Sequence, residues 1–237
     1  MSNRFYVEGE QRGEKVNDLF AHIAPRYDFI NDLQSFGLHR VWKRRVVRLA
    51  DVTPGDRALD VCCGTGDIAF ALARAGAHVN AVDFSEAMLG VARQRIQPSE
   101  LRPPQFQQSD AQRLEFPENT FDCVTAGYGL RNLRSWETGL REMHRVAKPG
   151  GKLLVLDFGK PDNVLWRCLY FAYLRCVVPV FGRFFCGDAA THAYIFESLR
   201  RYPAQRGVAE AMNRLGCREV RVVNLVGGAM SINFGIK

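Results

Sequence analysis

Short apolar runs alternate along the chain with longer segments in which apolar residues recur every three or four positions. The runs cover residues 58–62, 77–82, 120–126 and 152–157, with a weaker one near Phe106, and the periodic segments cover residues 68–75, 85–96 and 136–147. Short runs bounded by turn residues are typical of buried strands, and the periodic segments are typical of helices that cover them. The alternation predicts an α/β fold in which helices cover both faces of a parallel sheet.

The pattern changes toward both ends of the chain. Residues 13–23 carry an apolar helical face, and residues 27–45 mix polar, aromatic and apolar side chains. Near the C-terminus a helix is predicted over residues 203–215, followed by a β-hairpin of residues 219–225 and 230–236. We expect one domain over residues 1–237, made of a helical cap (13–50), a cofactor-binding core (51–160), a helical insertion over the substrate (160–202), and the last helix and hairpin (203–237).

The glycine turn of residues 57–67, RALDVCCGTGD, is the segment around which the predicted sheet is organised. A short apolar run ends there in Gly64, Thr65 and Gly66, and an apolar-periodic helix follows. The two glycines let the backbone approach a ligand without a Cβ in the way, and the start of the helix presents free backbone N–H groups. An open α/β sheet binds nucleotide-like ligands at such a turn, outside the carboxyl end of its first strand.

The carboxylates near this turn indicate what kind of ligand it holds. The pattern G-x-G-x-x-A, formed by Gly64, Gly66 and Ala69, also fits a dinucleotide. A pyrophosphate at the helix N-terminus would, however, lie beside Asp67 and near Asp60, which would repel it. A cationic ligand without phosphate, such as S-adenosylmethionine, is favoured instead. The alternative interpretation of Asp67 is that it only caps the helix.

Further polar groups follow the other predicted strands, at the same edge of the sheet. Asp83 lies 17 residues beyond the last turn glycine. This spacing suits an acid that accepts hydrogen bonds from ribose hydroxyls, the alternative being a cap of the next helix. Asp110 and Ala111 follow the weak third strand, and residues 127–132, GYGLRN, follow the fourth. A glycine-flanked tyrosine followed by arginine and asparagine at this edge is a favourable place for catalytic groups.

Composition adds a positive charge and excludes several classes of protein. The 237 residues carry 32 lysines and arginines against 25 acidic residues, a net charge of +7, with the densest basic run at residues 40–48. This charge fits an anionic membrane surface or a nucleic acid. No aromatic-interleaved RNA-binding motif or zinc-finger spacing occurs, so no nucleic acid partner is expected.

The cysteines and the N-terminal residues indicate the compartment. The seven cysteines are odd in number and form no C-x-x-C pair, which argues against a disulfide framework or a metal site and suggests a reducing environment. The first 15 residues contain no apolar signal segment. We therefore expect a cytoplasmic protein, with the inner face of the membrane as a candidate place of attachment.

Residues 164–186, VLWRCLYFAYLRCVVPVFGRFFC, are unusually aromatic. The segment is long enough to span a membrane, but Arg167, Arg175 and Pro179 interrupt it. We interpret it as helices that cover an apolar pocket and touch the membrane surface, the alternative being ordinary core.

Two long stretches resemble the signatures of the UbiE/COQ5 family of class I S-adenosylmethionine-dependent methyltransferases. Residues 27–42, YDFINDLQSFGLHRVW, are similar to the first signature, and residues 145–161, RVAKPGGKLLVLDFGKP, to the second. Residues 127–132 and 197–203, GYGLRN and ESLRRYP, match shorter motifs of the family. The resemblance implies a Rossmann-like, doubly wound, seven-stranded and mostly parallel sheet, with the C-terminal hairpin as an antiparallel edge and a helical N-terminal cap.

The resemblance also implies S-adenosylmethionine as cosubstrate, no metal, and methyl transfer to a ring carbon of a prenylated quinol. The expected cofactor contacts are Gly64 and Thr65 with the methionine part, Asp83 with the ribose, Asp110 and Ala111 with the adenine, Gly127 near the sulfonium, and Asp60, Gly66 and Phe84 elsewhere in the same site.

Methylation of the ring carbon requires a neighbouring hydroxyl to ionise, and the residues carried over from the family suit that step. Arg131 is expected to stabilise the oxyanion and Asn132 to orient the acceptor. Tyr27 or His39 is expected to accept or relay the proton, the alternative for His39 being a structural histidine packed against Trp42. Candidates for the groove of the prenyl tail are Tyr170, Phe171, Tyr173 and Phe181.

Several alternatives stay open at this point. The favoured acceptor is demethylmenaquinol, and the alternative is a benzoquinol precursor of ubiquinone, or both. The second alternative is a class I methyltransferase of another small phenolic metabolite. A nicotinamide-dependent enzyme is disfavoured by Asp67. A non-catalytic binding protein is disfavoured by the presence of all the expected site residues, Asp60, Gly64, Gly66, Asp83 and Arg131. Besides the quinol, the partners considered are an anionic membrane surface and a second copy of the chain.

Overall fold

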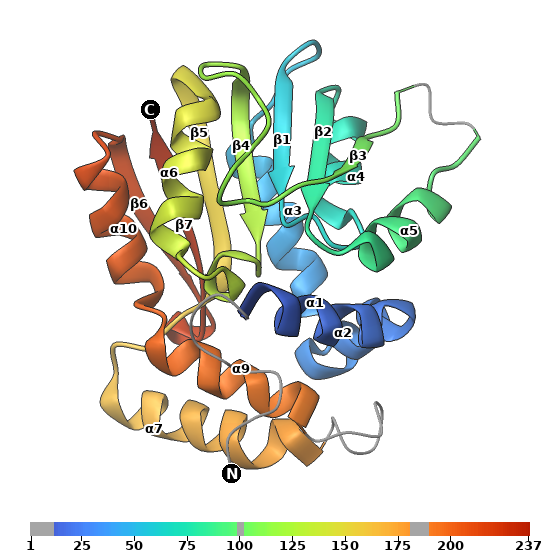
Figure 1. Cartoon of the computed structure of the whole chain (residues 1–237). Helices are drawn as coiled ribbons and strands as arrows, with labels where there is room; N and C mark the ends of the chain where they lie inside the picture. The colour runs from blue at the N-terminus through green and yellow to red at the C-terminus, as the bar shows by residue number, and fades with distance from the viewer. Residues whose placement is uncertain (1–11, 99–101, 181–189) are drawn as a thin grey trace.

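Seven strands form a single sheet within the part of the chain that this computed structural model describes, which is residues 12–98, 102–180 and 190–237. The strands are β1 (Arg57–Val61), β2 (His78–Asp83), β3 (Gln105–Gln108), β4 (Phe121–Gly127), β5 (Ala147–Phe158), β6 (Arg218–Leu225) and β7 (Met230–Ile236). Their order across the sheet is β3-β2-β1-β4-β5-β7-β6, which places the glycine turn after a strand in the middle of the sheet (Figure 1).

The first five strands are parallel, and the last two supply the antiparallel part. β1 pairs with β2 and β4, β2 with β3, and β4 with β5, all in parallel, whereas β7 runs antiparallel to both β5 and β6. The predicted seven-stranded, mostly parallel sheet with an antiparallel C-terminal hairpin is thereby confirmed. Because β7 lies between β5 and β6, only one strand of the hairpin, β6, lies at an edge of the sheet, and β3 forms the opposite edge.

β5 begins earlier than the sequence pattern predicts. The apolar run predicts the strand over residues 152–157, whereas Ala147 already pairs with Phe121 of β4, and residues 148–151 form a bulge in which Gly150 has a φ of +83°. The pairing changes register between Phe121 and Cys123. The backbone N–H of Gly150 donates to the carbonyl of Lys237 at 2.8 Å, so the end of the chain supplies partners that keep this segment in the sheet.

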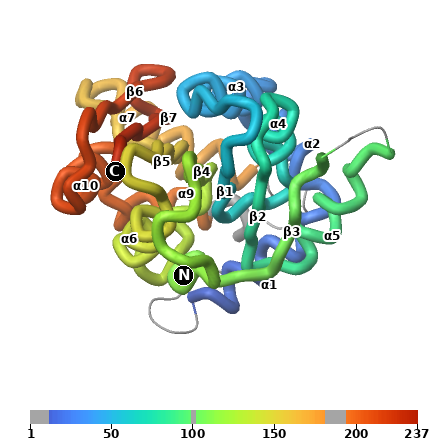
Figure 2. The backbone as a smooth tube through the Cα atoms, turned by 90° about the horizontal axis from the view of Figure 1, so that it is seen from above, coloured from blue at the N-terminus to red at the C-terminus, as the bar shows by residue number. Residues whose placement is uncertain are grey.

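Helices cover both faces of the sheet, as the alternation predicted. The described helices are α1 (Arg12–Ile23), α2 (Tyr27–Ser35), α3 (Leu38–Ala50), α4 (Asp67–Arg74), α5 (Glu86–Gln94), α6 (Trp136–Val146), α7 (Val164–Ala172), α9 (Ala190–Arg201) and α10 (Ala204–Arg214). α3 and α4 pack on one face and α6 and α10 on the other, as the view along the strands shows (Figure 2). This arrangement leaves the carboxyl ends of the parallel strands free of the two covering layers.

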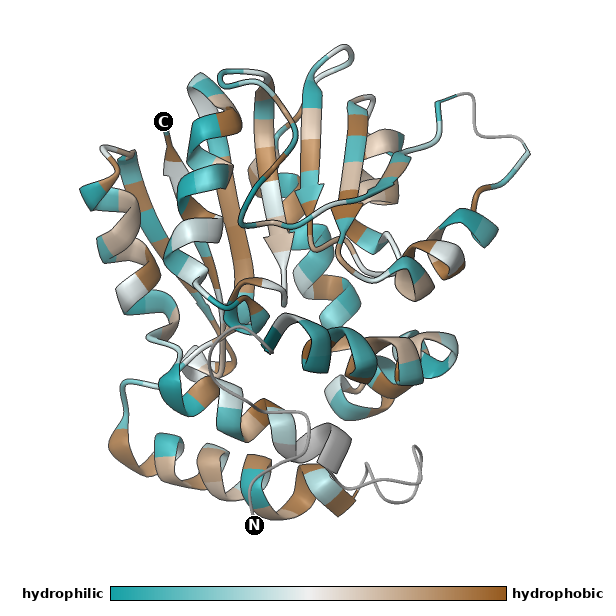
Figure 3. Cartoon of the chain, viewed as in Figure 1, coloured by the Kyte–Doolittle hydropathy of each residue, from teal (hydrophilic) through white to brown (hydrophobic). Residues whose placement is uncertain are grey.

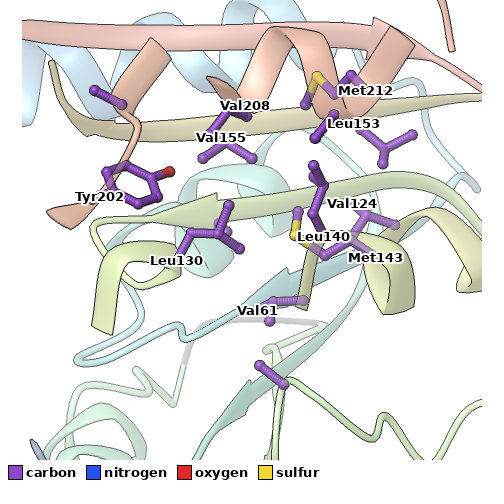
Figure 4. Close-up of a cluster of buried hydrophobic side chains, with 14 of the residues drawn as sticks. Val61, Val124, Leu130, Leu140, Met143, Leu153, Val155, Tyr202, Val208 and Met212 are labelled. Carbon is purple, nitrogen blue, oxygen red and sulfur yellow. The ribbon is translucent and has the colours of Figure 1, made fainter. Parts of the chain in front are cut away.

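The face under α6 and α10 holds the larger cluster of buried side chains (Figure 4). Leu140 and Met143 of α6 meet Val208 and Met212 of α10 over Val155 of β5, and all five are at most 1% exposed. Burying one such side chain is worth roughly 1.5–3 kcal/mol. This layer therefore anchors β4 and β5, and their carboxyl ends carry the functional residues described below.

The helical cap expected over residues 13–50 consists of three helices, but only two of them cover the end of the sheet. α1 and α2 lie across the carboxyl ends of the parallel strands, joined by a 3₁₀ turn at Ala24–Arg26 (Figure 1). α3 instead packs on the sheet face beside α4, through Val46 and Ala50. α7 and α9 of the insertion lie beyond the same end of the sheet (Figure 1). In the described residues, no helix has the length and apolar character that crossing a membrane would require.

Candidate active site

The glycine turn after β1 adopts a backbone that few side chains tolerate. Cys62, Gly64 and Gly66 have φ angles of +54°, +55° and +86°, so the chain bends sharply between β1 and α4. A Cβ on Gly66 would lie 2.9 Å from the ring of Phe106, so packing as well as φ requires this glycine. Gly64 instead borders a cavity, where a Cβ would meet the methyl group of Met88 at 3.2 Å. Gly64 is thus the turn glycine that a ligand would approach.

A cavity of about 300 Å³ lies at the carboxyl ends of β1, β2 and β4, and we call it the turn cavity. The predicted cofactor residues that line it are Gly64, Asp83, Phe84, Asp110, Ala111 and Gly127. These residues come from the ends of four strands, β1 to β4, and the loops after them, and they meet as the predicted topology requires. A volume of this size is at the lower end of the range for small-molecule sites.

Asp83 is held at the wall of the turn cavity by its own loop. Its carboxylate accepts hydrogen bonds from the backbone N–H groups of Gly64 at 2.8 Å and Ser85 at 2.9 Å. Burial raises the pKa of Asp83, although these two hydrogen bonds act in the opposite direction. The same carboxylate therefore ties the glycine turn to the end of β2 and still borders the cavity, where a ribose hydroxyl would find an acceptor.

The remaining predicted cofactor residues lie outside the turn cavity. Asp60 and Thr65 border a small cavity of about 20 Å³, which also touches Gly64 and Gly127. The Thr65 hydroxyl donates to Asp28 of α2 at 2.8 Å. Gly66 lines neither of these two cavities. Its part in the site is the bend of the backbone rather than contact with a ligand.

Asp67 does not act as the sequence suggested. The N-cap position of α4 is taken by Gly66, and Asp67 is the first residue of the helix. Its carboxylate bonds to Lys43 at 2.7 Å and to Arg95 at 2.6 Å. Burial acts to raise the pKa of Asp67, but these two cations lower it to about 2. Because Lys43 and Arg95 balance the charge of Asp67, this carboxylate would repel a pyrophosphate only weakly. The repulsion of a pyrophosphate by the site therefore depends on Asp60 and Asp83 instead.

A second cavity, of about 380 Å³, lies between the cap helices and the insertion, and we call it the apolar cavity. Its walls come mainly from Leu19, Ile23, Ile30, Trp166, Leu174 and Val178. Three predicted catalytic residues, Tyr27, His39 and Arg131, also line it. Phe20, Tyr27 and Tyr128 line both the apolar cavity and the turn cavity. The two cavities therefore meet at these aromatic side chains.

His39 is a buried polar group in the wall of the apolar cavity, held by a carboxylate. Its Nε2 lies 2.9 Å from Asp32, whose carboxylate is also held by Arg40 at 2.6 Å. The side chain is 3% exposed, and its Nδ1 is buried without a hydrogen-bond partner among the described residues. Burial, followed by the charge of Lys43, lowers the pKa of His39 below its usual 6.5, and Asp32 acts in the opposite direction. The imidazole is therefore neutral at pH 7, with Nδ1 as an acceptor when Nε2–H donates to Asp32.

Arg131 is fixed in the cavity wall by Asp157 at the end of β5. Its guanidinium donates to that carboxylate at 2.9 Å and to the carbonyl of Tyr128 at 2.6 Å, and it stands over the Phe158 ring, 4.5 Å from the centroid. Nε of Arg131 is buried and has no acceptor among the described residues. This nitrogen is the donor that an anionic oxygen in the apolar cavity would use.

Asn132 lies on the other side of the junction, in the wall of the turn cavity. Its amide nitrogen donates to the carbonyl of Tyr128 at 3.1 Å, and its amide oxygen accepts from the Tyr194 hydroxyl of α9 at 3.1 Å. Both ends of the side chain are thus engaged by protein groups. Asn132 holds Tyr128, whose φ of +63° is unusual for a non-glycine residue, at the place where the cavities meet.

The comparisons with known proteins agree with this geometry. The model of the ubiE/COQ5 methyltransferase family matches residues 8–237. This chain belongs to the UbiE/COQ5 methyltransferase family. A protein of Listeria monocytogenes serotype 4b named demethylmenaquinone methyltransferase is 39% identical over 231 residues, which cover 96% of this chain and 98% of that protein. A protein of Teredinibacter turnerae named ubiquinone/menaquinone biosynthesis C-methyltransferase UbiE is 39% identical over 235 residues, covering 98% of this chain and 94% of that one.

Solved structures share the fold of this UbiE/COQ5 methyltransferase at low sequence identity. A methyltransferase of Thermotoga maritima, described as S-adenosylmethionine-dependent, superposes with a TM-score of 0.63 at 20% identity and covers 93% of this chain and 99% of its own. A methyltransferase of Haloferax volcanii, in complex with an activator, gives a TM-score of 0.65 at 15% identity and covers 93% of this chain and 96% of its own. The predicted class I methyltransferase fold is thereby confirmed.

Sequence reasoning missed several residues that border the cavities of this UbiE/COQ5 methyltransferase. Tyr128 was noticed only as part of the GYGLRN motif, although it lines both main cavities. Asp32 bonds to the ring of His39, seven residues later. The sequence did not reveal this pair, because Gly37 separates α2 from α3 and the two residues do not share one helix. Lys43 belongs to the basic run of residues 40–48, whose charge suggested a surface that meets an anionic partner, yet its side chain is buried, with the residue only 8% exposed.

Replacing Gly129 by alanine is expected to distort the site of this UbiE/COQ5 methyltransferase. A Cβ there would lie 2.2 Å from the Cβ of Cys62, an atom fixed by the backbone of the glycine turn. Overpacking of this kind costs about 1–3 kcal/mol, and we expect a lower melting temperature together with weaker binding of S-adenosylhomocysteine. G90A on α5 is the matched control, because its Cβ would meet nothing within 4 Å and Gly90 lines neither main cavity. Equal effects of the two variants would contradict this prediction.

Proposed function

We propose that this chain transfers a methyl group from S-adenosylmethionine to a ring carbon of a prenylated quinol. The observation that carries the proposal is the meeting of the turn cavity and the apolar cavity at Tyr27 and Tyr128. The first cavity offers the carboxylate and apolar surfaces that a nucleoside needs, and the second is apolar with a few unpaired polar atoms. The names of the two relatives, which refer to menaquinone and ubiquinone biosynthesis, support this acceptor class.

S-adenosylmethionine supplies a methyl group that its sulfonium already activates. The chain has to align that group with the acceptor carbon and to make the carbon nucleophilic. Loss of the proton from a neighbouring ring hydroxyl raises the electron density at the carbon. In an apolar cavity this ionisation needs both a proton acceptor and a positively polarised partner for the oxygen.

His39 is our assignment for the proton acceptor, in preference to Tyr27. Burial raises the pKa of Tyr27, so its hydroxyl stays protonated and can donate a hydrogen bond but is a poor base. His39 is neutral, and its Nδ1 lacks a partner among the described residues. Asp32 holds the other nitrogen and stabilises the imidazolium that forms. The proton of the ring hydroxyl passes to Nδ1, in the same way that a carboxylate-oriented histidine works in other enzymes. The bond between the methyl carbon and the sulfur then breaks as the new carbon–carbon bond forms. The imidazolium returns its proton to the ring oxygen, and the methylated carbon releases its own proton as the ring becomes aromatic again, so that one proton leaves for each methyl group transferred.

Arg131 is our assignment for the group that stabilises the resulting oxyanion. Its charge is partly balanced by Asp157, which keeps the guanidinium in place before the acceptor arrives. A preorganised donor of this kind stabilises a developing negative charge without the reorganisation that water would need. Asn132 and Tyr27 act beside it by fixing the loop of Tyr128 and the junction of the cavities.

The prenyl tail is placed in the apolar cavity by the residues of the insertion. Tyr170 and Tyr173 line this cavity, and the Tyr170 hydroxyl is engaged by the carbonyl of Ala229 at 3.0 Å, which leaves its ring as an apolar surface. Phe171 does not line the cavity and packs instead against the ring of Phe196 in α9. Phe181, the fourth candidate, lies outside the described residues.

Exposed apolar side chains around the apolar cavity form a surface for the membrane that would hold such a substrate. On α7, Leu165 is 72% and Leu169 is 56% exposed, and Phe36 at the turn between α2 and α3 is 84% exposed. The outer side of α7 is accordingly coloured as hydrophobic in Figure 3. Arg40 beside this turn and Arg167 on α7 are exposed as well, which suits an anionic lipid surface. We place the membrane contact of the enzyme on this surface.

Leu165→Asp is expected to weaken binding to vesicles that contain phosphatidylglycerol by about tenfold or more, measured by co-sedimentation. Burying one leucine side chain is worth about 1.5–3 kcal/mol, and the new carboxylate would also face anionic lipid. Asn213→Asp on α10 makes the same change of charge on an exposed polar position and is expected to bind as the unchanged protein does. Equal binding of the two variants, or equal turnover of a short-tail quinol with and without lipid, would contradict the membrane assignment.

The acceptor is tested by methyl transfer from labelled S-adenosylmethionine, with prereduced demethylmenaquinol and the benzoquinol precursor of ubiquinone offered side by side. We expect methylation of the naphthoquinol. The equal identities of the two relatives, one of which is named for both pathways, support the benzoquinol as a second acceptor. Binding of the cofactor without methylation of either quinol would refute the proposal and favour another phenolic metabolite.

A further inference from the structure

We propose that Lys43 of α3 binds the carboxylate of the amino acid part of S-adenosylmethionine, in the small cavity that it lines together with Asp60 of β1, a cofactor contact that the family resemblance already implies. This inference rests on the proposed function, because it assumes that S-adenosylmethionine occupies the turn cavity. It makes the α3 segment, which the sequence suggested was a charged surface, a part of the cofactor site.

The small cavity beside the glycine turn is where this recognition takes place. Its volume is about 20 Å³, which holds a single small polar group but not a ring. It adjoins the turn cavity, since Tyr27, Cys62, Gly64, Gly127 and Tyr128 line both. A ligand whose nucleoside fills the turn cavity can therefore extend a short chain with a charged end into it.

Asp60 contributes an unused acceptor to this cavity. One oxygen of its carboxylate accepts from the Thr125 hydroxyl at 2.8 Å. The other oxygen, Oδ2, has no donor among the described residues, although the residue is only 1% exposed. A buried carboxylate oxygen without a donor is unfavourable, and an ammonium group from a ligand would satisfy it.

Lys43 contributes unused donors to the same cavity. Its ammonium makes one hydrogen bond among the described residues, to Asp67 at 2.7 Å. An ammonium has three N–H donors, so further donors are available to a ligand. Its Nζ also lies 5.9 Å from the centroid of the Tyr128 ring, at the junction of the main cavities. The carboxylate of the amino acid end would thus meet a cation that is already in place. Burial raises the pKa of Asp60 to about 7, and an ammonium group beside it would favour its charged form.

The arrangement around Asp67 allows this role to be tested without exposing a buried charge. Asp67 bonds to Arg95 as well as to Lys43, so it keeps a cationic partner when Lys43 is replaced. Lys43→Met preserves the length of the apolar stem and removes only the ammonium. Arg44→Met is the matched control, since Arg44 lies next to it on α3 but is exposed.

The test is the binding of two ligands, measured by calorimetry on the whole chain. S-adenosylhomocysteine carries the amino acid end, and 5′-methylthioadenosine has the same nucleoside thioether without it. A charge-assisted hydrogen bond corresponds to about a 10- to 100-fold change in Kd. We expect K43M to weaken binding of S-adenosylhomocysteine by about this factor and to leave 5′-methylthioadenosine unchanged, with R44M like the unchanged protein for both.

The other outcomes overturn the inference in distinguishable ways. Equal weakening of both ligands in K43M would mean that Lys43 only supports the shape of the site, and no weakening would mean that it has no part in binding. If the unchanged protein binds neither ligand, the proposed function itself fails. If K43M does not fold, the unchanged protein is compared with an S-adenosylhomocysteine analogue lacking only the carboxylate, and equal affinity for the two would overturn the role of Lys43.

Discussion

His39→Gln is expected to lower kcat by about 10²- to 10⁴-fold, while the Kd of S-adenosylhomocysteine stays unchanged. General base catalysis typically contributes a factor of this size, and glutamine offers no basic nitrogen at the position of Nδ1. His39 lines the apolar cavity and not the turn cavity, so its loss should leave the cofactor site intact. The measurement is single-turnover methyl transfer to a short-tail quinol. An unchanged rate would show that His39 is only a structural residue packed beneath the cavity.

The pH profile separates this role from a structural one. A base works in its unprotonated form, so kcat should rise with pH through the pKa of His39 and then level off. Burial and the charge of Lys43 lower this pKa, against the opposing effects of Asp32 and Asp67. The acid limb should therefore have its midpoint below the ordinary value of 6.5 for histidine. Asp32→Asn should lower kcat less than H39Q does. It should also shift this limb to lower pH, because it removes the carboxylate that favours the protonated ring and so lowers the pKa of His39 further.

Asp157→Asn is expected to destabilise the fold by about 3–5 kcal/mol, measured as a shift of the urea midpoint. Asp157 and Arg131 are 2.9 Å apart, and their side chains are only 3% and 6% exposed. Removing one member of a buried ion pair leaves the other charge without compensation, which is far costlier than losing a surface pair. The exposed pair of Asp162 and Arg206 is the control, and D162N is expected to cost at most about 1 kcal/mol.

A double-mutant cycle tests whether the cost of D157N comes from the uncompensated arginine. R131M combined with D157N removes both charges, so the double variant should be more stable than the sum of the single changes predicts. The double variant should also lose methyl transfer, because the donor for the oxyanion is gone. Additive effects on stability would contradict the interpretation of the two residues as one buried unit.

Local patterns were sufficient for most of the fold. The glycine turn, the strand before it and the helix after it depend on neighbouring residues in the sequence, and they appear where the pattern placed them. β5 begins before the predicted residue 152, because the partners that hold the bulge of residues 148–151 in the sheet come from the end of the chain. The insertion was predicted as helical, but which side chains face the cavity depends on a π-helical turn at Tyr173–Val177. The extra residue in such a turn shifts the helical phase, which the apolar composition does not reveal.

The residues of the site could be named from the sequence more readily than their partners. The family resemblance placed Asp83, Asp110 and Gly127 at the edge of the sheet, and they line one cavity there. The balancing of Asp67 by Lys43 and Arg95 could not be foreseen, since these residues lie 24 and 28 positions away and meet only in the folded chain. The same is true of the hydrogen bond between Asp32 and His39, which crosses the break between α2 and α3.

The hydrogen bond between Thr65 and Asp28 joins the glycine turn to α2, and α2 also supplies Tyr27 and Ile30 to the wall of the apolar cavity. A ligand that fixes the conformation of the glycine turn therefore also fixes the position of α2, which forms one wall of the apolar cavity. Linkage requires any such coupling to be equal in both directions, so the factor by which the methyl donor changes the affinity for the quinol is also the factor by which the quinol changes the affinity for the donor.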